Sequence, residues 1–289
     1  MEEAAHYALQ RGKPMERIVK IGMIQMQVEF HNPQKNLDRA ETLVAQAVAM
    51  GAEICVLPEC MDMGWATPEA PALAQPIPGP VSDRLCRIAH KFSVWLACGL
   101  TEREGNHVYN AAVLICADGT IRAHHRKINI LTDVESMYTV GDRLSVVETP
   151  FGRVGLAICA DNLSPSLCLG HSLARMGAQM ILSPSAWAVA PDRDVEKHPY
   201  GQEWHVPYQT LSSLYHIPVV GVSNVGAMPV GLWAGWKAIG NSIAYDSDGT
   251  CAAVLPYGSD AECVRVISLT VRKPGTLGTA LAEAVHGDI

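Results

Sequence analysis

The run of residues 153–162 constrains the fold most, because an apolar segment leads into a cysteine and then stops at polar residues. A short and almost uninterrupted apolar segment is typical of a buried strand in an α/β protein. Chemistry in such proteins is usually placed at the carboxyl ends of the strands. We therefore expect a strand over residues 154–158 that delivers Cys159 as a candidate nucleophile, although a buried cysteine more often serves packing.

Two other apolar segments also end at a lone ionisable group. Residues 52–58 lead into Glu59, and residues 121–125 lead into Arg126 and Lys127. An acid, an amine and a thiol, each delivered by its own segment, form a set of groups suited to nucleophilic catalysis.

The composition indicates a chain with a substantial core. It has 289 residues, of which 48% are hydrophobic, enough for one large domain or two small ones. No linker divides the sequence, so we predict a single domain over residues 18–270. Residues 1–17 are expected to be an N-terminal extension, and residues 271–289 a C-terminal tail.

Charge and cysteine usage exclude several classes of protein. The formal net charge is −7 and the charges are interspersed, which argues against a nucleic-acid partner. No signal-peptide pattern and no apolar run of bilayer length is present, so we expect a cytoplasmic protein without a membrane partner. The nine cysteines lack paired metal-ligand spacing and the histidines are scattered, so no disulfide, metal or other cofactor is predicted.

Hydrophobic periodicity predicts helices that alternate with strands. Helices are expected over residues 36–50, 82–92, 167–176 and 202–215, the second with Ser82 as its N-cap. Strands are expected over residues 18–25, 54–57, 94–99, 108–115, 120–124, 146–149, 154–158, 180–182, 219–222, 242–245, 252–255 and 263–269. Three pairs of these strands read as hairpins, so the fold class is α/β with mixed sheets covered by helices.

The order of acid, lysine and cysteine resembles the nitrilase superfamily of carbon–nitrogen hydrolases. Leu57-Pro58-Glu59 is similar to the first motif of the family, Arg126-Lys127 to the second and residues 155–161 to the third. Residues 177–187 resemble the strand and loop that follow the nucleophile. The resemblance implies a four-layer α-β-β-α sandwich that assembles as a homodimer or a higher even-numbered homo-oligomer.

The chemistry of amide cleavage assigns a role to each group. Cys159 is the expected nucleophile, and Glu59 the general base that later returns the proton as an acid. Lys127, together with the backbone N–H of Ala160, is expected to stabilise the oxyanion. The resemblance adds Glu135 as a second glutamate that orients Lys127 or the leaving nitrogen.

Two departures from the family pattern bear on the substrate. Many relatives have a glutamate where this chain has Ser166, and true nitrilases carry Trp-Glu where this chain has Ala160 and Asp161. The second difference favours hydrolysis of an amide or carbamoyl group over that of a nitrile.

Aromatic and polar residues on the predicted loops are the candidates for substrate binding. They are Trp65, Asp161, Asn162, Trp187, His198, Tyr200 and Trp204, with Trp233 and Trp236 as further pocket walls. For each tryptophan a packing role is an equal alternative. Arg175 and Arg193 are only distant candidates for binding a carboxylate group of the substrate. The acidic residues on the loops could instead bind a positive group, so we expect a neutral or cationic amide.

Four interpretations stay open at this point. The first is an amidase that releases ammonia from a small amide through a thioester acyl-enzyme, and the second is an N-carbamoyl amidohydrolase. The third is a non-catalytic binding protein with the same fold. The fourth is a hydrolase that uses a metal ion bound by the scattered histidines and aspartates.

Overall fold

The computed structural model describes residues 16–194 and 197–273, which include almost all of the predicted domain. The predicted extension over residues 1–17 lies outside this range except for its last two residues. Residues 274–289 of the predicted tail also lie outside it.

One six-stranded mixed sheet has the strand order β15-β1-β2-β3-β4-β5. Its strands are β1 (Arg17–Gln25), β2 (Ile54–Val56), β3 (Trp95–Glu104), β4 (His107–Ile115), β5 (Ile121–Arg126) and β15 (Cys263–Val271). Strands β1, β2 and β3 run parallel to one another, and the other neighbouring pairs are antiparallel.

The second six-stranded sheet has the order β14-β13-β10-β8-β7-β6. Its strands are β6 (Val146–Thr149), β7 (Gly152–Leu156), β8 (Met180–Ser185), β10 (Val219–Ser223), β13 (Ile243–Tyr245) and β14 (Cys251–Val254). The three predicted hairpins are confirmed as β4 with β5, β6 with β7, and β13 with β14.

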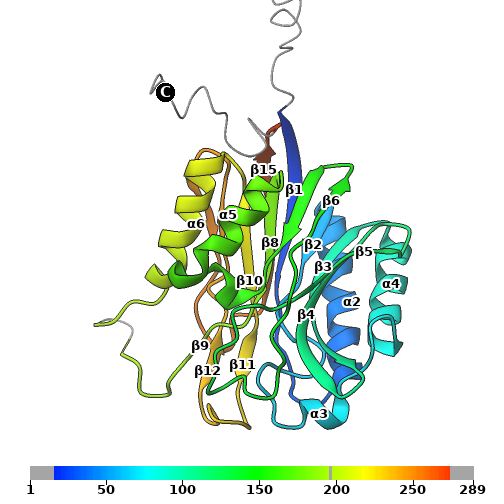
Figure 1. Ribbon diagram of the computed structural model, residues 1–289, viewed down its shortest axis with the longest axis vertical. Coiled ribbons are helices and arrows are strands. Elements are labelled where there is room, and N and C mark those ends of the chain that lie inside the picture. The colour runs from blue at the N-terminus through cyan, green and yellow to red at the C-terminus, as the bar shows by residue number, and fades with distance from the viewer. Residues whose placement is uncertain (1–15, 195–196, 274–289) are drawn as a thin grey trace, which may run out of the picture.

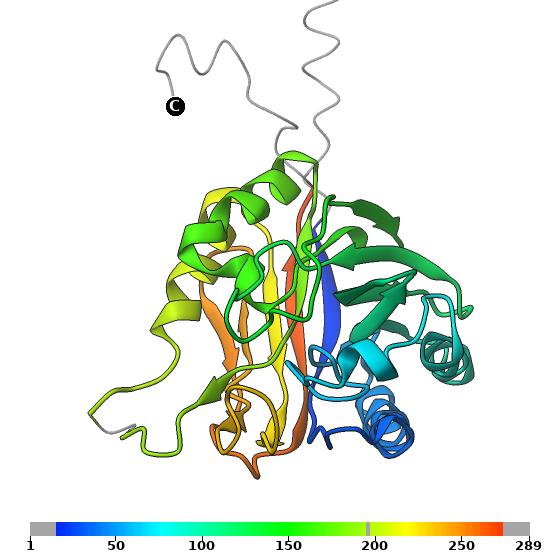
Figure 2. The same cartoon turned by 60° about the horizontal axis from the view of Figure 1, so that its bottom comes forward.

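Helices cover the outer face of each sheet. Helices α2 (Pro33–Ala49) and α4 (Pro80–Phe92) lie on the first sheet, and α5 (Leu167–Arg175) and α6 (Gln202–Tyr215) lie on the second. Figure 2 shows α2 and α4 nearly end on at one side of the paired sheets, with α5 and α6 on the other side. The predicted four-layer α-β-β-α sandwich is confirmed, and the largest apolar cluster fills the space between its sheets.

Local sequence signals explain where α2 begins and ends. The Asn32 side chain accepts a hydrogen bond from the backbone N–H of Lys35 (3.3 Å), and Pro33 occupies the first turn. Gly51 follows with φ +90°, a conformation that glycine adopts without a steric penalty. Helix α4 begins two residues earlier than predicted. Its N-cap is Gly79, and the predicted cap Ser82 instead bonds to the backbone of Gly79 from the first turn.

Three further features differ from the sequence prediction. A small third sheet forms from β9 (Ala188–Val189), β11 (Val225–Ala227) and β12 (Lys237–Ile239), whose strands are too short for periodicity to show. Strand β7 ends at Leu156, so Cys159 is not at the strand end and instead begins the 3-10 helix η1 (Cys159–Asn162). The short helix α3 (Ala70–Leu73) was also not predicted.

All nine cysteines are free thiols in the structure. Within the described part of the chain, no helix has both the length and the apolar character needed to cross a membrane.

Gly99 in β3 allows the loop after β2 to lie directly on the neighbouring strand. A Cβ at this position would overlap the Cα of Glu59 and lie 2.6 Å from the carbonyl oxygen of Pro58. We expect Gly99→Ala to lower the free energy of unfolding by about 1–3 kcal/mol through overpacking. Because the displaced backbone carries Glu59, catalytic activity should fall as well, and chemical denaturation with parallel rate measurements checks both effects.

Gly105 provides the control for this substitution. It lies in the turn between β3 and β4 with φ +58°, and a Cβ added there would have no other atom within 4 Å. Gly105→Asn should leave stability and activity nearly unchanged, because asparagine tolerates positive φ. Equal effects of the two substitutions would contradict the steric explanation.

Candidate active site

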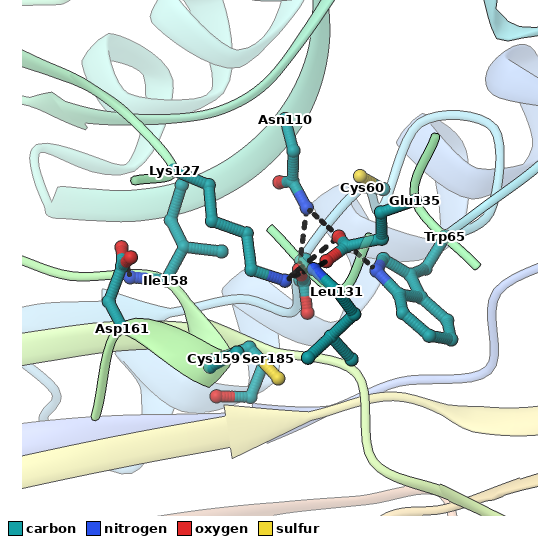
Figure 3. Close-up of polar contacts among 12 residues, drawn as sticks. Cys60, Trp65, Asn110, Lys127, Leu131, Glu135, Ile158, Cys159, Asp161 and Ser185 are labelled. Carbon is teal, nitrogen blue, oxygen red and sulfur yellow. Dashed lines mark hydrogen bonds and ion pairs between the residues drawn. The ribbon is translucent and has the colours of Figure 1, made fainter. Parts of the chain in front are cut away.

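Three loops bring an acid, an amine and a thiol together between the two sheets. Glu59 lies in the loop after β2, Lys127 follows β5 directly, and Cys159 begins η1 after β7. The first two side chains are fully buried and Cys159 is only 4% exposed. Figure 3 shows the Lys127 side chain reaching toward Glu135, with Cys159 beside it. The structure therefore brings together the residues that the sequence singled out.

The Lys127 ammonium lies between two carboxylates. Its Nζ is 2.8 Å from Glu59 Oε1, and 2.8 Å and 3.0 Å from the two oxygens of Glu135. Glu135 is as buried as the other two groups, so the sequence prediction that it contacts Lys127 agrees with its position.

Glu135 is fixed by additional donors. Its Oε1 accepts hydrogen bonds from the indole N–H of Trp65 (2.7 Å) and from Asn110 Nδ2 (3.0 Å). Its Oε2 accepts the backbone N–H of Leu131 (2.9 Å). A carboxylate with this many donors is restricted to one orientation, and it restricts Lys127 in turn.

Asn110 connects the two carboxylates and was missed by the sequence analysis. Its Nδ2 donates to Glu59 Oε1 (2.6 Å) as well as to Glu135, and its backbone carbonyl accepts the N–H of Lys127 (2.8 Å). An asparagine inside the otherwise apolar run 108–115 was the available signal, because a buried amide needs polar partners.

Glu59 has one carboxylate oxygen left for chemistry. Its Oε2 is buried and has no hydrogen-bond partner among the residues that the structure describes. Burial raises the pKa of Glu59 to about 7, with the Lys127 charge opposing the rise and the Glu135 charge adding to it. A carboxyl group with a pKa near neutrality can take up and return a proton.

Lys127 stays protonated in this site. Burial lowers the pKa of its ammonium, but Glu135 and Glu59 more than reverse this effect, so the pKa lies well above its ordinary value. The group is therefore a permanent positive charge that can stabilise an oxyanion but does not transfer protons.

Cys159 is present as a neutral thiol. Burial raises the pKa of the thiol well above its ordinary value, and the Glu59 charge adds to this, whereas Lys127 and the backbone N–H of Ala186 act in the opposite direction. Its backbone has φ +41°, an uncommon conformation for a residue with a side chain. Forming the reactive thiolate thus requires a base, and Glu59 is the candidate for that role.

The backbone N–H of Ala160 belongs to the first turn of η1. A backbone N–H in the first turn of a helix has no acceptor within that helix and is free to bind an anion. Its expected contact with the oxyanion stays a prediction.

Asp161 and Asn162 bind protein groups in the structure, although the sequence suggested contacts with substrate. Asn162 Nδ2 donates to Ser183 Oγ (2.8 Å), which also accepts the backbone N–H of Cys159 (3.2 Å). Asp161 Oδ2 lies 2.8 Å from Nε2 of the buried His125. Both side chains therefore support the turn that carries the nucleophile.

The other predicted substrate residues fall into two groups. The rings of Trp187 and Trp204 stack 4.8 Å apart, and the indole N–H of Trp204 donates to the hydroxyl of Tyr200 (2.8 Å). Burial raises the pKa of the Tyr200 hydroxyl. Trp187 and Trp204 belong to the same buried apolar cluster as Cys159, and Tyr200 packs against that cluster. His198 is exposed on the preceding loop, outside this aromatic group.

The tryptophans at 65, 233 and 236 form a second aromatic group, on the Glu135 side of the site. Trp65 contacts Trp233 edge-on with ring centres 5.1 Å apart, and Trp233 stacks on Trp236 at 4.0 Å. Trp65 is thus part of the site through Glu135, and the other two continue toward the surface.

The described residues contain no group of three or more histidine, cysteine, aspartate or glutamate side chains arranged to bind a metal ion.

Comparison with known proteins identifies the family. A family model described as carbon-nitrogen hydrolase matches residues 20–271. The chain belongs to the carbon–nitrogen hydrolase family, which confirms the resemblance to the nitrilase superfamily.

Relatives with assigned names match part of this carbon–nitrogen hydrolase. Omega-amidase NIT2 from Xenopus tropicalis is 32% identical over 164 residues, which are 53% of this chain and 58% of the relative. Omega-amidase NIT2 from Mus musculus is 33% identical over 178 residues, which are 58% of this chain and 63% of the relative. The chain thus matches less than two thirds of the length of these relatives.

Solved structures match the fold over most of the chain. A carbon-nitrogen hydrolase from Helicobacter pylori G27 has a TM-score of 0.78 at 23% identity, covering 87% of this chain and 89% of that chain. Nit3 from Saccharomyces cerevisiae, a member of branch 10 of the nitrilase superfamily, has a TM-score of 0.72 at 22% identity, covering 93% and 94%.

The position of Glu59 predicts the pH dependence of catalysis. If Glu59 is the base, it must be ionised to act, and with its pKa at about 7 kcat/KM should fall as the pH drops below 7 and level off above it. The pH profile of kcat/KM measures this limb. A profile whose acidic limb lies near pH 4.5, the ordinary range of a glutamate, would contradict the assignment of Glu59 as the base.

Proposed function

We propose that this hydrolase cleaves the carbon–nitrogen bond of a small amide and releases ammonia through a thioester acyl-enzyme on Cys159. One observation carries the proposal. Glu59 combines a free carboxylate oxygen with a pKa of about 7, in contact with a Lys127 ammonium whose pKa is raised and beside a neutral thiol. The base, the positive charge and the nucleophile that amide cleavage needs are therefore present together.

In the first half-reaction, Glu59 takes the thiol proton while the sulfur of Cys159 attacks the carbonyl carbon. The carbonyl oxygen becomes an oxyanion, which Lys127 and the N–H of Ala160 stabilise. As the tetrahedral intermediate collapses, Glu59 gives its proton to the nitrogen. The carbon–nitrogen bond breaks, ammonia leaves, and the acyl group stays on the sulfur as a thioester.

In the second half-reaction, water replaces ammonia at the same position. Glu59, ionised again, takes a proton from the water as its oxygen attacks the thioester carbon. A second oxyanion forms at Lys127, the carbon–sulfur bond breaks, and the proton on Glu59 returns to the sulfur of Cys159. The product is a carboxylic acid, and the enzyme is restored.

Related proteins support the type of reaction. Several relatives at 31–33% identity are named omega-amidases, and one at 32% identity, from Pyrococcus abyssi, is named nitrilase. A single mutant of the amidase from Nesterenkonia sp. AN1, whose fold matches with a TM-score of 0.72 at 20% identity, has been solved with the acetamide moiety of fluoroacetamide added covalently at its active-site cysteine. A mutant of the same amidase was solved in complex with acrylamide. The omega-amidases and the amidase favour an amide as the substrate, and the relative named nitrilase is the reason that nitriles are kept in the test below.

A surface groove outside the site favours a neutral or cationic substrate. Residues 130–134 line this groove with Leu232 and Trp233, and its volume is about 420 Å³. Two of its lining residues contact the site, because the backbone N–H of Leu131 donates to Glu135 and the ring of Trp233 packs on Trp65. Its one charged lining residue is Asp133, which attracts a positive group and repels a carboxylate.

Ammonia release by the wild type and Cys159→Ala tests the proposal. The panel contains aliphatic amides, ω-amides with an amino or guanidino group, N-carbamoyl amino acids and nitriles. We expect release from an amide and its complete loss in Cys159→Ala, because the acyl-enzyme then has no sulfur to form on. Release that persists in Cys159→Ala would contradict the mechanism.

Two controls separate the remaining interpretations. Activity after treatment with a strong chelator should be unchanged, and a loss that zinc restores would favour the metal-dependent alternative. No release from any compound would favour a non-catalytic protein. Iodoacetamide labelling then shows whether Cys159 is reactive, with the labelled peptides identified individually because Cys168 and Cys251 are exposed and also react.

Arg193 gives a specific reason to keep an N-carbamoyl amino acid as the second candidate. Its guanidinium lies 5.4 Å from the centre of the Tyr200 ring, next to the aromatic group near Cys159. Two of its nitrogens donate to the backbone carbonyls of His198 (3.2 Å) and Pro199 (3.1 Å). The guanidinium could therefore bind the carboxylate of a substrate that lies near Tyr200.

Two substitutions distinguish the candidates. If the substrate is a cationic amide, Asp133→Lys should raise its KM by about threefold, a small effect because the charge is exposed, and Arg193→Gln should leave it unchanged. If the substrate is an N-carbamoyl amino acid, Arg193→Gln should raise KM instead, and Asp133→Lys should not. Steady-state kinetics with one compound of each class makes the comparison.

The expected even-numbered homo-oligomer stays a prediction, which sedimentation of the full chain can test.

A further inference from the structure

The carboxylate of Asp161 joins the two loops that carry the catalytic residues. Its Oδ1 accepts the backbone N–H groups of Ile128 (3.1 Å) and Asn129 (2.8 Å), which follow Lys127 directly. Its Oδ2 accepts the backbone N–H of Ile158 (3.0 Å), just before the nucleophile. One side chain, only 1% exposed, is therefore bonded to both loops.

His125, which precedes Lys127 in the chain, contacts the same carboxylate. Its Nε2 lies 2.8 Å from Asp161 Oδ2, and the side chains of both residues are 1% exposed. Along the chain, residues on both sides of Lys127 thus bind Asp161: residue 125 before it, and residues 128 and 129 after it. A third link comes from Asn129 Nδ2, which donates to the carbonyl oxygen of Ala160 (2.7 Å).

We propose that His125 and Asp161 are a positioning pair that sets the separation between the Lys127 ammonium and the Cys159 thiol. This inference rests on the catalytic roles proposed above for those two residues. Neither member of the pair contacts the reacting atoms, so both act through the loops they join.

The pair also holds the backbone conformation of Cys159. Cys159 has φ +41°, and such a conformation persists only where the surroundings enforce it. Asp161 closes the turn around Cys159 by binding the N–H of Ile158, while its other oxygen fixes the turn against the lysine loop. The strained turn and the lysine loop are therefore positioned by the same group.

Asp161 acts as an anion and not as a proton donor. Burial raises its pKa, but the hydrogen bond and charge of His125 and the N–H groups of Asn129 and Ile158 outweigh this, so the pKa lies below its ordinary value. A carboxylate that is ionised at neutral pH and already accepts four hydrogen bonds has no proton to supply to the substrate.

Three substitutions test the pair. In Asp161→Asn the side-chain NH₂ group faces a backbone N–H donor whichever way the amide is turned, because both oxygens of Asp161 accept such donors. His125→Leu removes the contact to Asp161 Oδ2. Both should lower kcat by about 10²-fold, the effect of a misplacement of about 1 Å, with KM changed by less than about threefold. His125→Gln, whose amide nitrogen can replace Nε2 as a donor, should recover kcat to within about tenfold of the wild type.

His124 provides the matched control on the same strand. Its Nε2 pairs with Glu102 at 2.9 Å, so His124→Leu also removes a histidine–carboxylate contact, but one that does not reach the nucleophile loop. We expect its kcat to equal that of the wild type. Thermal denaturation of each variant shows what fraction is folded in the assay.

A second measurement does not depend on turnover. The rate of Cys159 alkylation by iodoacetamide should fall in His125→Leu and recover in His125→Gln, because the thiolate loses its aligned lysine. A melting temperature lowered without a change in kcat or alkylation per folded molecule would overturn the proposal and leave a purely structural role. If no amide is hydrolysed but the alkylation pattern is as expected, the proposed function fails and the positioning role stands.

Discussion

The buried Lys127 ammonium is the interaction on which the rest of the site depends. Moving a charge out of water costs several kcal/mol, and only close carboxylates with fixed geometry offset that cost. Glu59 and Glu135 supply them at 2.8 Å, and Asn110 and Trp65 fix the carboxylates in turn. Removing one partner from such a buried group typically costs about 3–5 kcal/mol, so the residues proposed to be catalytic also stabilise the fold.

The site exists only where the two sheets pack together. The first sheet supplies the acid and the amine through the loops after β2 and β5, and the second supplies the thiol after β7. The N–H of Glu59 donates to the carbonyl oxygen of Ser185 at the end of β8 (3.1 Å), which connects the sheets beside the nucleophile. Errors in sheet packing therefore change the distances on which catalysis depends.

Much of this arrangement could be predicted from the sequence. Glu59, Lys127 and Cys159 each follow a strand-forming apolar run, and strands that end at one edge of a sandwich bring such residues together. Helix α6 spans the predicted residues, although its apolar periodicity is weaker than that of α2, α4 or α5.

Other features depend on contacts that no local pattern reports. Strand β3 continues to Glu104 through charged residues that read as a loop, because Arg126 on β5 pairs with Glu102 and Glu104. The position of Asp161 shortly after Cys159 suggested that it binds the substrate. Its partner in the structure is His125, which is 36 positions away in the sequence. Long-range pairing of polar groups is thus what the sequence could not show.

The pairing of β1 with β15 has a consequence for how the molecule is made. The strand that opens the described fold lies antiparallel to the one that closes it, with Arg17 opposite Val271. The first sheet is therefore incomplete until residue 271 has left the ribosome, and contacts between such distant segments form slowly. During that time the nascent chain exposes the unpaired edge of β1, which can pair with another chain and aggregate. A chaperone acting during synthesis would therefore protect this protein more than it would protect a protein built from local contacts.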